Sequence, residues 1–511
     1  MYQILKNKKI NREYLYLIGI FIISRFIYIF FFDISFDTWI FKVYWQFFPE
    51  NLLRNDLIQS LFYNHFQAPL LNLILGVLMK ISDKFAIILQ FIFLSLSLLN
   101  FIFLFKILNQ FRINKNLSLA LVVLLMIIPT TILYENHPYK EHIVMCFLTI
   151  VIYYSIRIIK EPSKYNYTFF SLFLILLLLL RETFHIFWAF TYIIFIHVIN
   201  KQFKKNLITI LLITVFILPL YLKNFFLYNQ FAISLTSFEH LSQKIEFVKK
   251  MKTNEQHKKI RDFIFNNKKE SELFFSSMSK IFYIDVNSNP DTYKEILNYE
   301  YKYNNQLLKS NTSFNEVYIK VDEVRKTDFM KVLKNYPELL LISISNSALR
   351  HFFRSSDTFY FTRFNADKIP TLIRLSHCIK ITLACIYEFP FDKVKFKIND
   401  MSFMKINDNN FSYMDRIKFS LNDMNFLIIF IYFYVMFSLV KCLINKQKLD
   451  NISKLVNFWV STFIIIFLLL VLFEDGEIPR HRYPFDYIMI IFSLYYNKLN
   501  SSIFNETKKN I

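Results

Sequence analysis

The stretch YTFFSLFLILLLLLRETFHIFWAFTYIIFIHVI, from Tyr167 to Ile199, decides the class of fold, because it is apolar except near its middle. As one helix it would be about 50 Å long at 1.5 Å per residue, well over the roughly 30 Å hydrocarbon core of a bilayer. The charged pair Arg181 and Glu182 divides it into two segments, each close to the length of a short span. The sequence therefore predicts two membrane helices joined by a tight turn that carries an arginine.

The composition of the whole chain agrees with this interpretation. Of 511 residues, 54% are hydrophobic and 19% are charged, which is too apolar for an ordinary soluble protein. The net charge of +21 could indicate nucleic-acid binding, but long uncharged runs would make a cytoplasmic nucleic-acid binder insoluble. We therefore expect an all-α, polytopic membrane protein in contact with a lipid bilayer and with no nucleic-acid partner.

Apolar runs along the chain predict about ten transmembrane helices. They lie at 14–32, 84–105, 117–133, 142–159, 167–180, 184–199, 207–227, 424–442, 455–473 and 483–497. If each run crosses once, the most basic loops all fall on one side, namely 106–115, 157–164, 201–205 and 446–454. The positive-inside rule makes that side cytoplasmic, and the N-terminus with it.

The same parity decides two further apolar segments. Residues 68–82 are too short for a comfortable span, and a crossing there would move the later basic loops outside, so we expect a re-entrant or juxtamembrane helix on the outer face. Residues 371–389 place Arg374, His377 and Lys380 on one face, which favours an amphipathic surface helix over a span.

This topology divides the chain into three regions. They are a seven-span core at 1–227 with a first outer loop at 33–83, an extracytoplasmic insert at 228–423, and a three-span C-terminal region at 424–511. The insert is rich in Lys and Asn and contains amphipathic pieces such as 239–251 and 329–333, so we expect it to be mainly helical.

Ionisable side chains are costly at membrane depth, so those at the outer ends of spans are the first functional candidates. Asp33 and Asp37 follow the first run four residues apart, on one helix face if that helix continues. A carboxylate there is either a general base or a solvated helix end. Arg181 suits phosphate because its planar fork donates two hydrogen bonds at once, although snorkelling and pairing with Glu182 are equally compatible with its position.

The predicted outer turn at 134–142, YENHPYKEH, holds more polar groups than a connector needs. A metal site would use His137, Glu141 and His142, but their spacing matches no strong ligand pattern. No metal is therefore expected.

The predicted turn at 474–483, EDGEIPRHRY, holds one of the 3 glycines of the chain, which suggests a need of the backbone there. Its two arginines, Arg480 and Arg482, are placed to hold an anionic headgroup or phosphate. A simple interfacial anchor is the alternative.

Six segments together resemble the GT-C membrane glycosyltransferases, especially the protein O-mannosyltransferases and the bacterial lipid A aminoarabinose transferases. They are DTW at 37–39 with WQ at 45–46, SLFYNHFQAPLLN at 60–72, YEN at 134–136, LRETFHIFW at 180–188, PLYLKN at 219–224, and GE at 476–477 with RHRY at 480–483. Residues 240–420 have no counterpart in this likeness. Ala68 and Asn229 stand where the family pattern has a proline and a glycine, so an inactive relative is one alternative.

The resemblance implies transfer of a sugar from a polyprenyl-phosphate donor to a lipid, glycan or protein acceptor on the extracytoplasmic face. By likeness Asp37 is the catalytic acid of the first outer loop, Asp33 is the runner-up, and Glu135 matches a second acidic position. The residues assigned to substrate binding are His65, Gln67, Asn136, His137, Arg181, Lys223, Asn224, Glu477, Arg480 and Arg482. No cofactor is expected, because the leaving phosphate is already an anion that guanidinium groups can stabilise.

Two other functions fit the same membrane topology. A transporter or flippase of lipid-linked sugars would also place arginines at membrane edges, but it calls for inverted repeats or broken helices, and no internal repeat is evident. A lipid-linked sugar polymerase is chemically close to the transferase. The favoured location is a bacterial inner membrane, or the endoplasmic reticulum membrane if the protein is eukaryotic.

Overall fold

The computed structural model describes residues 12–234, 326–347, 365, 368–369, 426–444, 449–473 and 478–509, apart from short gaps at 39, 44–46, 49, 65–66, 229 and 327–328. Every regular element in these ranges is an α-helix, which confirms the all-α class for the described part of the chain. The predicted helices at 239–251 and 371–389 lie outside the described residues. Of the insert, residues 329–335 and helix α18 (Pro337–Ser347) are described and are helical.

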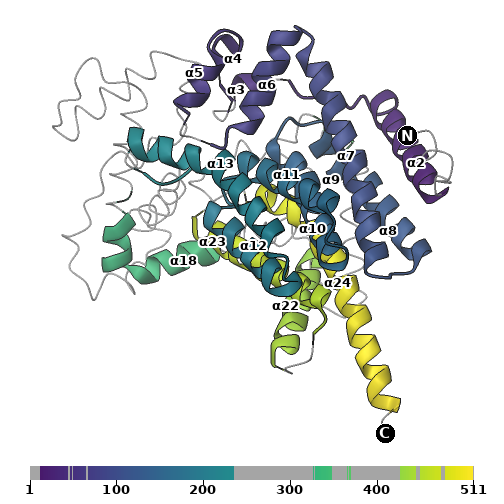
Figure 1. The fold of residues 1–511 in the computed structure, drawn as a ribbon. Helices are drawn as coiled ribbons and strands as arrows, with labels where there is room; N and C mark the ends of the chain where they lie inside the picture. Colours follow the sequence, from purple (N-terminus) through teal and green to yellow (C-terminus); the bar gives the residue numbers. More distant parts are fainter. Residues whose placement is uncertain are drawn as a thin grey trace, which may run out of the picture.

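The remaining helices follow the order of the predicted apolar runs (Figure 1). They are α2 (Arg12–Phe30), α3 (Ile40–Val43), α4 (Glu50–Asn55), α5 (Leu57–Phe62), α6 (Leu70–Ile81), α7 (Phe85–Gln110), α8 (Lys115–Ile127), α9 (Pro129–Glu135), α10 (Lys140–Lys160), α11 (Lys164–Leu180), α12 (Ile186–Asn200), α13 (Phe203–Tyr228), α22 (Phe426–Ile444), α23 (Asn451–Phe473) and α24 (Ile478–Lys509). Residues 68–82 contain α6, so the expected short helix is present there.

Five of these helices are long and apolar enough to cross a membrane, namely α2, α7, α10, α13 and α23. A sixth span results if the bent pair α8 and α9 is counted as one. Helices α6, α11 and α12 are apolar but shorter, as is the segment Ile428–Cys442 of α22. The structure thus has the character of a multi-pass membrane protein. Each of the ten predicted runs overlaps a described helix, and the run at 117–133 is divided between two.

Helix α10 is the centre of the bundle. It packs against α7, α11 and α24 (Figure 1). Of its most apolar stretch of 18 residues, 83% is buried inside the protein. The corresponding stretches of α2 and α13 are only 28% and 22% buried, so these helices turn long apolar surfaces outward. An apolar helix that is buried all round is a core helix, whereas one that exposes apolar side chains is suited to lipid.

The run at 117–133 was expected to be one helix, and the structure divides it into α8 and α9, bent by 57°. The cause is Pro129, which lacks a backbone N–H. Within a continuous helix it would remove a hydrogen bond, whereas at the start of α9 the missing N–H is harmless. The Thr131 hydroxyl donates to the Leu125 carbonyl at 2.7 Å, which satisfies an acceptor near the break. All 7 residues of α9 are buried, so the bend carries the chain into the interior just before Asn136.

Candidate functional site

Four segments that are far apart in the sequence meet beside the first turn of α10. They are the loop after α2, the turn between α9 and α10, the turn between α11 and α12, and the first turn of α24. The packing of α24 against α10 brings the C-terminal region to the N-terminal core (Figure 1). The candidate site is therefore built by tertiary packing rather than by one continuous motif.

Asp37 lies in the loop after α2 and is buried against the turn that follows α9. Its backbone N–H donates to the Asn136 carbonyl at 2.9 Å, and its Oδ2 lies 3.5 Å from Nδ1 of His137. The two side chains are only 4% and 2% exposed. Burial lowers the pKa of His137 below its usual 6.5, although the neighbouring Asp37 acts in the opposite direction. At neutral pH the imidazole is therefore neutral, and the Asp37 carboxylate stands beside a hydrogen-bonding group that carries no charge.

A second buried carboxylate, Glu141, is surrounded by basic side chains. Its Oε1 lies 3.2 Å from Nε of Arg480, 3.5 Å from Nη1 of Arg181 and 3.6 Å from Nδ1 of His481. Glu141 is fully buried, and neither of its oxygens forms a hydrogen bond of good geometry with a described residue. Two arginines that are 299 positions apart in the sequence are thus held at one carboxylate through ionic attraction.

Tyr139 links these two groups. Its ring centroid lies 4.3 Å from that of His137, and the guanidinium carbon of Arg480 lies 4.8 Å from the same tyrosine ring. A continuous series of buried contacts therefore runs from Asp37 to Arg181. Its members, in order, are Asp37, His137, Tyr139, Arg480, Glu141 and Arg181.

Arg482 lies next to this series but has an acidic neighbour of its own. Its Nε donates to Oδ1 of Asp486 at 3.0 Å, and the Tyr432 hydroxyl donates to the same oxygen at 3.0 Å. The residue after Arg482, Tyr483, stacks on Tyr134 of α9 with ring centroids 3.8 Å apart. This stacking packs the N-terminal part of α24 against α9.

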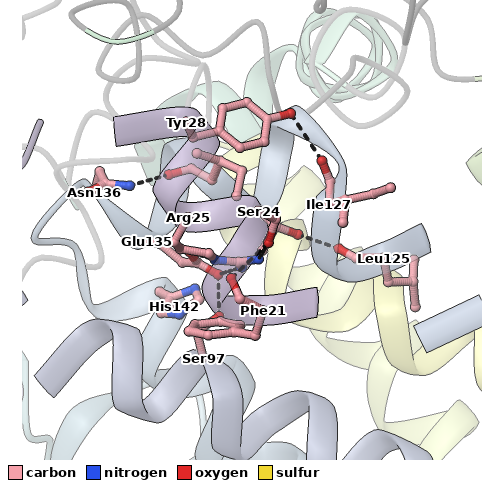
Figure 2. A network of polar contacts seen from close by, with 12 residues as sticks. Phe21, Ser24, Arg25, Tyr28, Ser97, Leu125, Ile127, Glu135, Asn136 and His142 are labelled. Atoms are coloured by element: carbon pink, nitrogen blue, oxygen red, sulfur yellow. Dashed lines mark hydrogen bonds and ion pairs between the residues drawn. The ribbon is translucent and has the colours of Figure 1, made fainter. Parts of the chain in front are cut away.

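Glu135, which the resemblance matched to a second acidic position, contacts different partners. Its carboxylate accepts from Nε of Arg25 at 2.8 Å and from the Ser97 hydroxyl, and it is completely buried (Figure 2). Arg25 reaches it from α2 and Ser97 from α7. Glu135 therefore directly precedes the turn of Asn136 and His137 and is anchored to α2 and α7 in the interior of the bundle.

The sequence left the partner of Arg181 open, with Glu182 as one alternative. In the structure Glu182 pairs with Lys140, whose Nζ lies 2.8 Å from Oε1. Burial acts to raise the pKa of Glu182, but the charge and hydrogen bond of Lys140 together with the charge of Arg181 outweigh it, and the pKa falls to about 2. The guanidinium of Arg181 instead contacts Glu141, Thr183 and His481.

Asp33, the runner-up for the catalytic acid, faces away from the buried series. Its side chain is 93% exposed, with Oδ2 3.4 Å from Nζ of Lys368 in the insert. Its backbone has a φ of 51°, in the left-handed region, so the helical conformation has already ended there. Asn365 of the insert exchanges hydrogen bonds with Ser35, so described residues of the insert contact the first outer loop.

Three further candidates form a second group near the start of α6 and the end of α13. Lys223 donates to the Asn64 carbonyl at 2.5 Å, and Asn64 donates to the Gln67 carbonyl at 2.8 Å. The Asn224 amide donates to the carbonyls of Ala232 and Ile233. The Lys223 contact joins the first outer loop to α13, whereas the Asn224 contacts hold the chain that follows α13. The remaining candidates, His65 and Glu477, lie outside the described residues.

Sequence reasoning did not single out Arg25, and it considered Glu141 only as a metal ligand. A signal for Arg25 was present, since it is an arginine within the apolar run at 14–32, where an ionisable residue needs a partner. Nothing in the local sequence of 140–142 shows that two arginines approach Glu141, because those contacts arise from helix packing.

Comparison of the chain with protein-family models, curated proteins and solved structures finds no match. Among the described residues, no group of three or more His, Cys, Asp or Glu side chains is placed to hold a metal ion. What the geometry offers is a buried carboxylate beside a neutral imidazole, in contact with a basic cluster. Such a pair of features can accept a proton at one end and stabilise an anion at the other.

Proposed function

We propose that the protein is a multi-pass membrane glycosyltransferase that takes a sugar from a polyprenyl-phosphate donor and passes it to an acceptor on the extracytoplasmic face. The observation that carries this proposal is the buried contact series that joins Asp37 to Arg480 and Arg181. These three residues were singled out from separate segments of the sequence, and a shared site is what the proposed reaction requires.

In the proposed reaction, Asp37 accepts the proton of the acceptor hydroxyl while the oxygen of that hydroxyl attacks the anomeric carbon of the sugar. The bond between that carbon and the phosphate oxygen breaks, and the lipid phosphate leaves with the electron pair. Arg181 and Arg480 stabilise the negative charge on the departing phosphate in a buried setting, where such interactions are strong. His137 orients the Asp37 carboxylate, from which it lies 3.5 Å.

The positions of the site residues support ten crossings with the N-terminus in the cytoplasm. Asp37 follows α2, His137 follows α9, Arg181 follows α11 and Arg480 begins α24. In the ten-span count these are the outer ends of spans one, three, five and ten, which must lie at one face of the membrane. We place this face outside, and with it the loop at 33–83 and the insert, in a bacterial inner membrane by preference.

The proposal is tested by sugar transfer with purified protein in lipid nanodiscs and polyprenyl-monophosphate sugars as donors. Replacing Asp37 by Asn should reduce turnover by about 100-fold or more, the usual contribution of a general base. Asp33→Asn is the matched control, because this aspartate is 93% exposed and should be dispensable. If transfer survives both substitutions, the assignment is wrong.

One observation favours a transporter or flippase of lipid-linked sugars as a second candidate. Helices α8 and α9 form a broken pair bent by 57°, and broken helices are typical of transporter binding sites. A transporter would move an intact labelled donor across a vesicle membrane without releasing lipid phosphate. A polymerase would instead give a product that lengthens with time, whereas the proposed transferase adds one sugar.

A further inference from the structure

Three helices meet at one buried carboxylate, that of Glu135 (Figure 2). The guanidinium of Arg25 donates to both of its oxygens, from Nε at 2.8 Å to Oε2 and from Nη2 to Oε1. Ser97 donates to Oε1, and Ser24 accepts from Nη1 of Arg25 at 2.8 Å. The pair is enclosed, since its side chains are 6% and 0% exposed.

An ion pair in this position is an expensive way to hold helices together. Removing both charges from water costs several kcal/mol per ion, and apolar side chains of similar volume often stabilise a core as well or better. Arg25 lies on an apolar helix with the character of a membrane span, where an ionisable group is costlier still. A two-pronged ion pair there points to a requirement for fixed geometry rather than for stability.

The geometry that it holds is the turn after α9. Glu135 is the last residue of α9, and the next residue, Asn136, accepts a hydrogen bond from the backbone N–H of Asp37 at 2.9 Å. The Asn136 side chain is itself fixed, because its Oδ1 accepts from Gln90 at 3.1 Å. The next residue again, His137, faces the Asp37 carboxylate. These two contacts of Asp37 are therefore made by the two residues that directly follow the anchored Glu135.

We infer that Arg25 and Glu135 are positioning residues, whose ion pair sets the Asn136 and His137 turn and thereby the place of Asp37 in the buried series. Glu135 then acts through the turn rather than on the sugar, although the resemblance matched it to an acidic position of the site. The consequence for catalysis rests on the proposed glycosyltransferase function, whereas the placement of Asp37 does not.

The deciding variant replaces both charges, Arg25→Met with Glu135→Leu, so that neither partner is left buried alone. We expect thermal stability close to that of the wild type, because the apolar pair fills a similar volume. We also expect amide hydrogen exchange in residues 33–38 and 136–139 to accelerate by about tenfold or more, since the turn opens locally. Turnover should fall by roughly 100-fold with a nearly unchanged donor KM, the effect of a misplaced catalytic group.

The matched control removes another buried polar contact, that between the Tyr496 hydroxyl and Asn457 Oδ1 at 2.5 Å. Tyr496 lies about 24 Å along α24 from Arg480 at 1.5 Å per residue. Asn457→Leu with Tyr496→Phe should leave exchange in 33–38 and 136–139 as in the wild type. If the Met and Leu variant does not fold, Arg25→Lys keeps the charge but loses the two-pronged geometry, and it should accelerate exchange in the same two segments.

The outcomes separate the positioning role of the ion pair from the glycosyltransferase proposal. Wild-type exchange rates in both segments of the Met and Leu variant, or of Arg25→Lys if that is the folded one, would overturn the positioning role. Faster exchange confined to those segments supports it, even if the wild type transfers no sugar. In that last case the glycosyltransferase proposal fails while the inferred placement of Asp37 stands.

Discussion

Glu141 is the counter-ion of two buried arginines, and neutralising it should have two opposite effects. Its Oε1 lies 3.2 Å from Arg480 and 3.5 Å from Arg181. Each contact has a Coulomb energy of about 5 kcal/mol at an effective dielectric of about 20. Glu141→Gln removes this attraction and leaves both guanidinium groups buried. Breaking a buried pair in this way typically lowers the free energy of unfolding by about 3–5 kcal/mol, so the Tm should fall by several degrees.

The second effect concerns binding of a phosphate. Under the proposed function, a donor phosphate in the wild type would meet the negative charge of Glu141 as well as the arginines, whereas in the Gln variant that repulsion would be gone. At roughly 6 Å and a dielectric of about 20, the repulsion is on the order of 3 kcal/mol. Even half of this is equivalent to a tenfold gain in affinity, since about 1.4 kcal/mol corresponds to a factor of ten. The destabilised variant should therefore recover more stability from phosphate than the wild type does.

The assay is thermal unfolding of purified protein in nanodiscs with farnesyl phosphate, and with farnesol as the uncharged ligand. We expect a lower Tm for Glu141→Gln without ligand, a larger increase with farnesyl phosphate than in the wild type, and no difference with farnesol. Arg480→Gln is the comparison variant, and it should lose the response to phosphate. The reasoning is refuted if Glu141→Gln is as stable as the wild type or gains no more than it from the phosphate.

Two other predictions follow from the described contacts. Burial lowers the pKa of His137, so this histidine binds a proton more readily in the unfolded chain than in the folded protein. Its contribution to stability is therefore complete above pH 6.5 and is lost as the pH falls from 6.5 toward the lowered pKa of the folded state. Wild-type protein should therefore lose more stability than His137→Gln between pH 7 and about pH 5 in denaturation curves, and parallel curves would contradict this. A Cβ on Gly76 would lie 2.3 Å from Cδ1 of Leu57, whereas one on Gly19 would meet nothing within 4 Å. Gly76→Ala should cost about 1–3 kcal/mol through overpacking, and Gly19→Ala should cost nothing measurable; equal Tm values for the two variants would show that α5 and α6 do not pack as described.

The helices could be predicted from the sequence because the apolar runs that specify them are local. The run at 167–199 is a clear case, since Arg181 and Glu182 mark the turn between α11 and α12 that the structure contains. The break in the run at 117–133 was missed, although Pro129 was a visible signal for it. A hydropathy average over many residues hides a single proline, whereas the helix breaks at that proline.

The partners of the buried charges could not be predicted in the same way. Arg25 pairs with Glu135 across 110 positions, and Arg480 meets Glu141 only because α24 packs against α10. Which of several acids an arginine reaches depends on the rotation and register of two packed helices, and no local pattern records that. The nearest acid in the sequence is a poor guide, as Arg181 shows, because its neighbour Glu182 pairs with Lys140.

The preference for Asp37 over Asp33 in the proposed function depends on local structure that the spacing of the two residues does not show. Their spacing places both carboxylates on one face only if the first helix continues, but α2 ends at Phe30 and Asp33 has a φ of 51°. That single left-handed residue turns the chain, so Asp33 points outward with 93% of its side chain exposed, while Asp37 is 4% exposed against His137. The proposed general base has to be held in place, and of the two aspartates only Asp37 is buried. The proposed role of Asp37 therefore rests on one backbone angle and one burial, and comparison of Asp33→Asn with Asp37→Asn is its direct test.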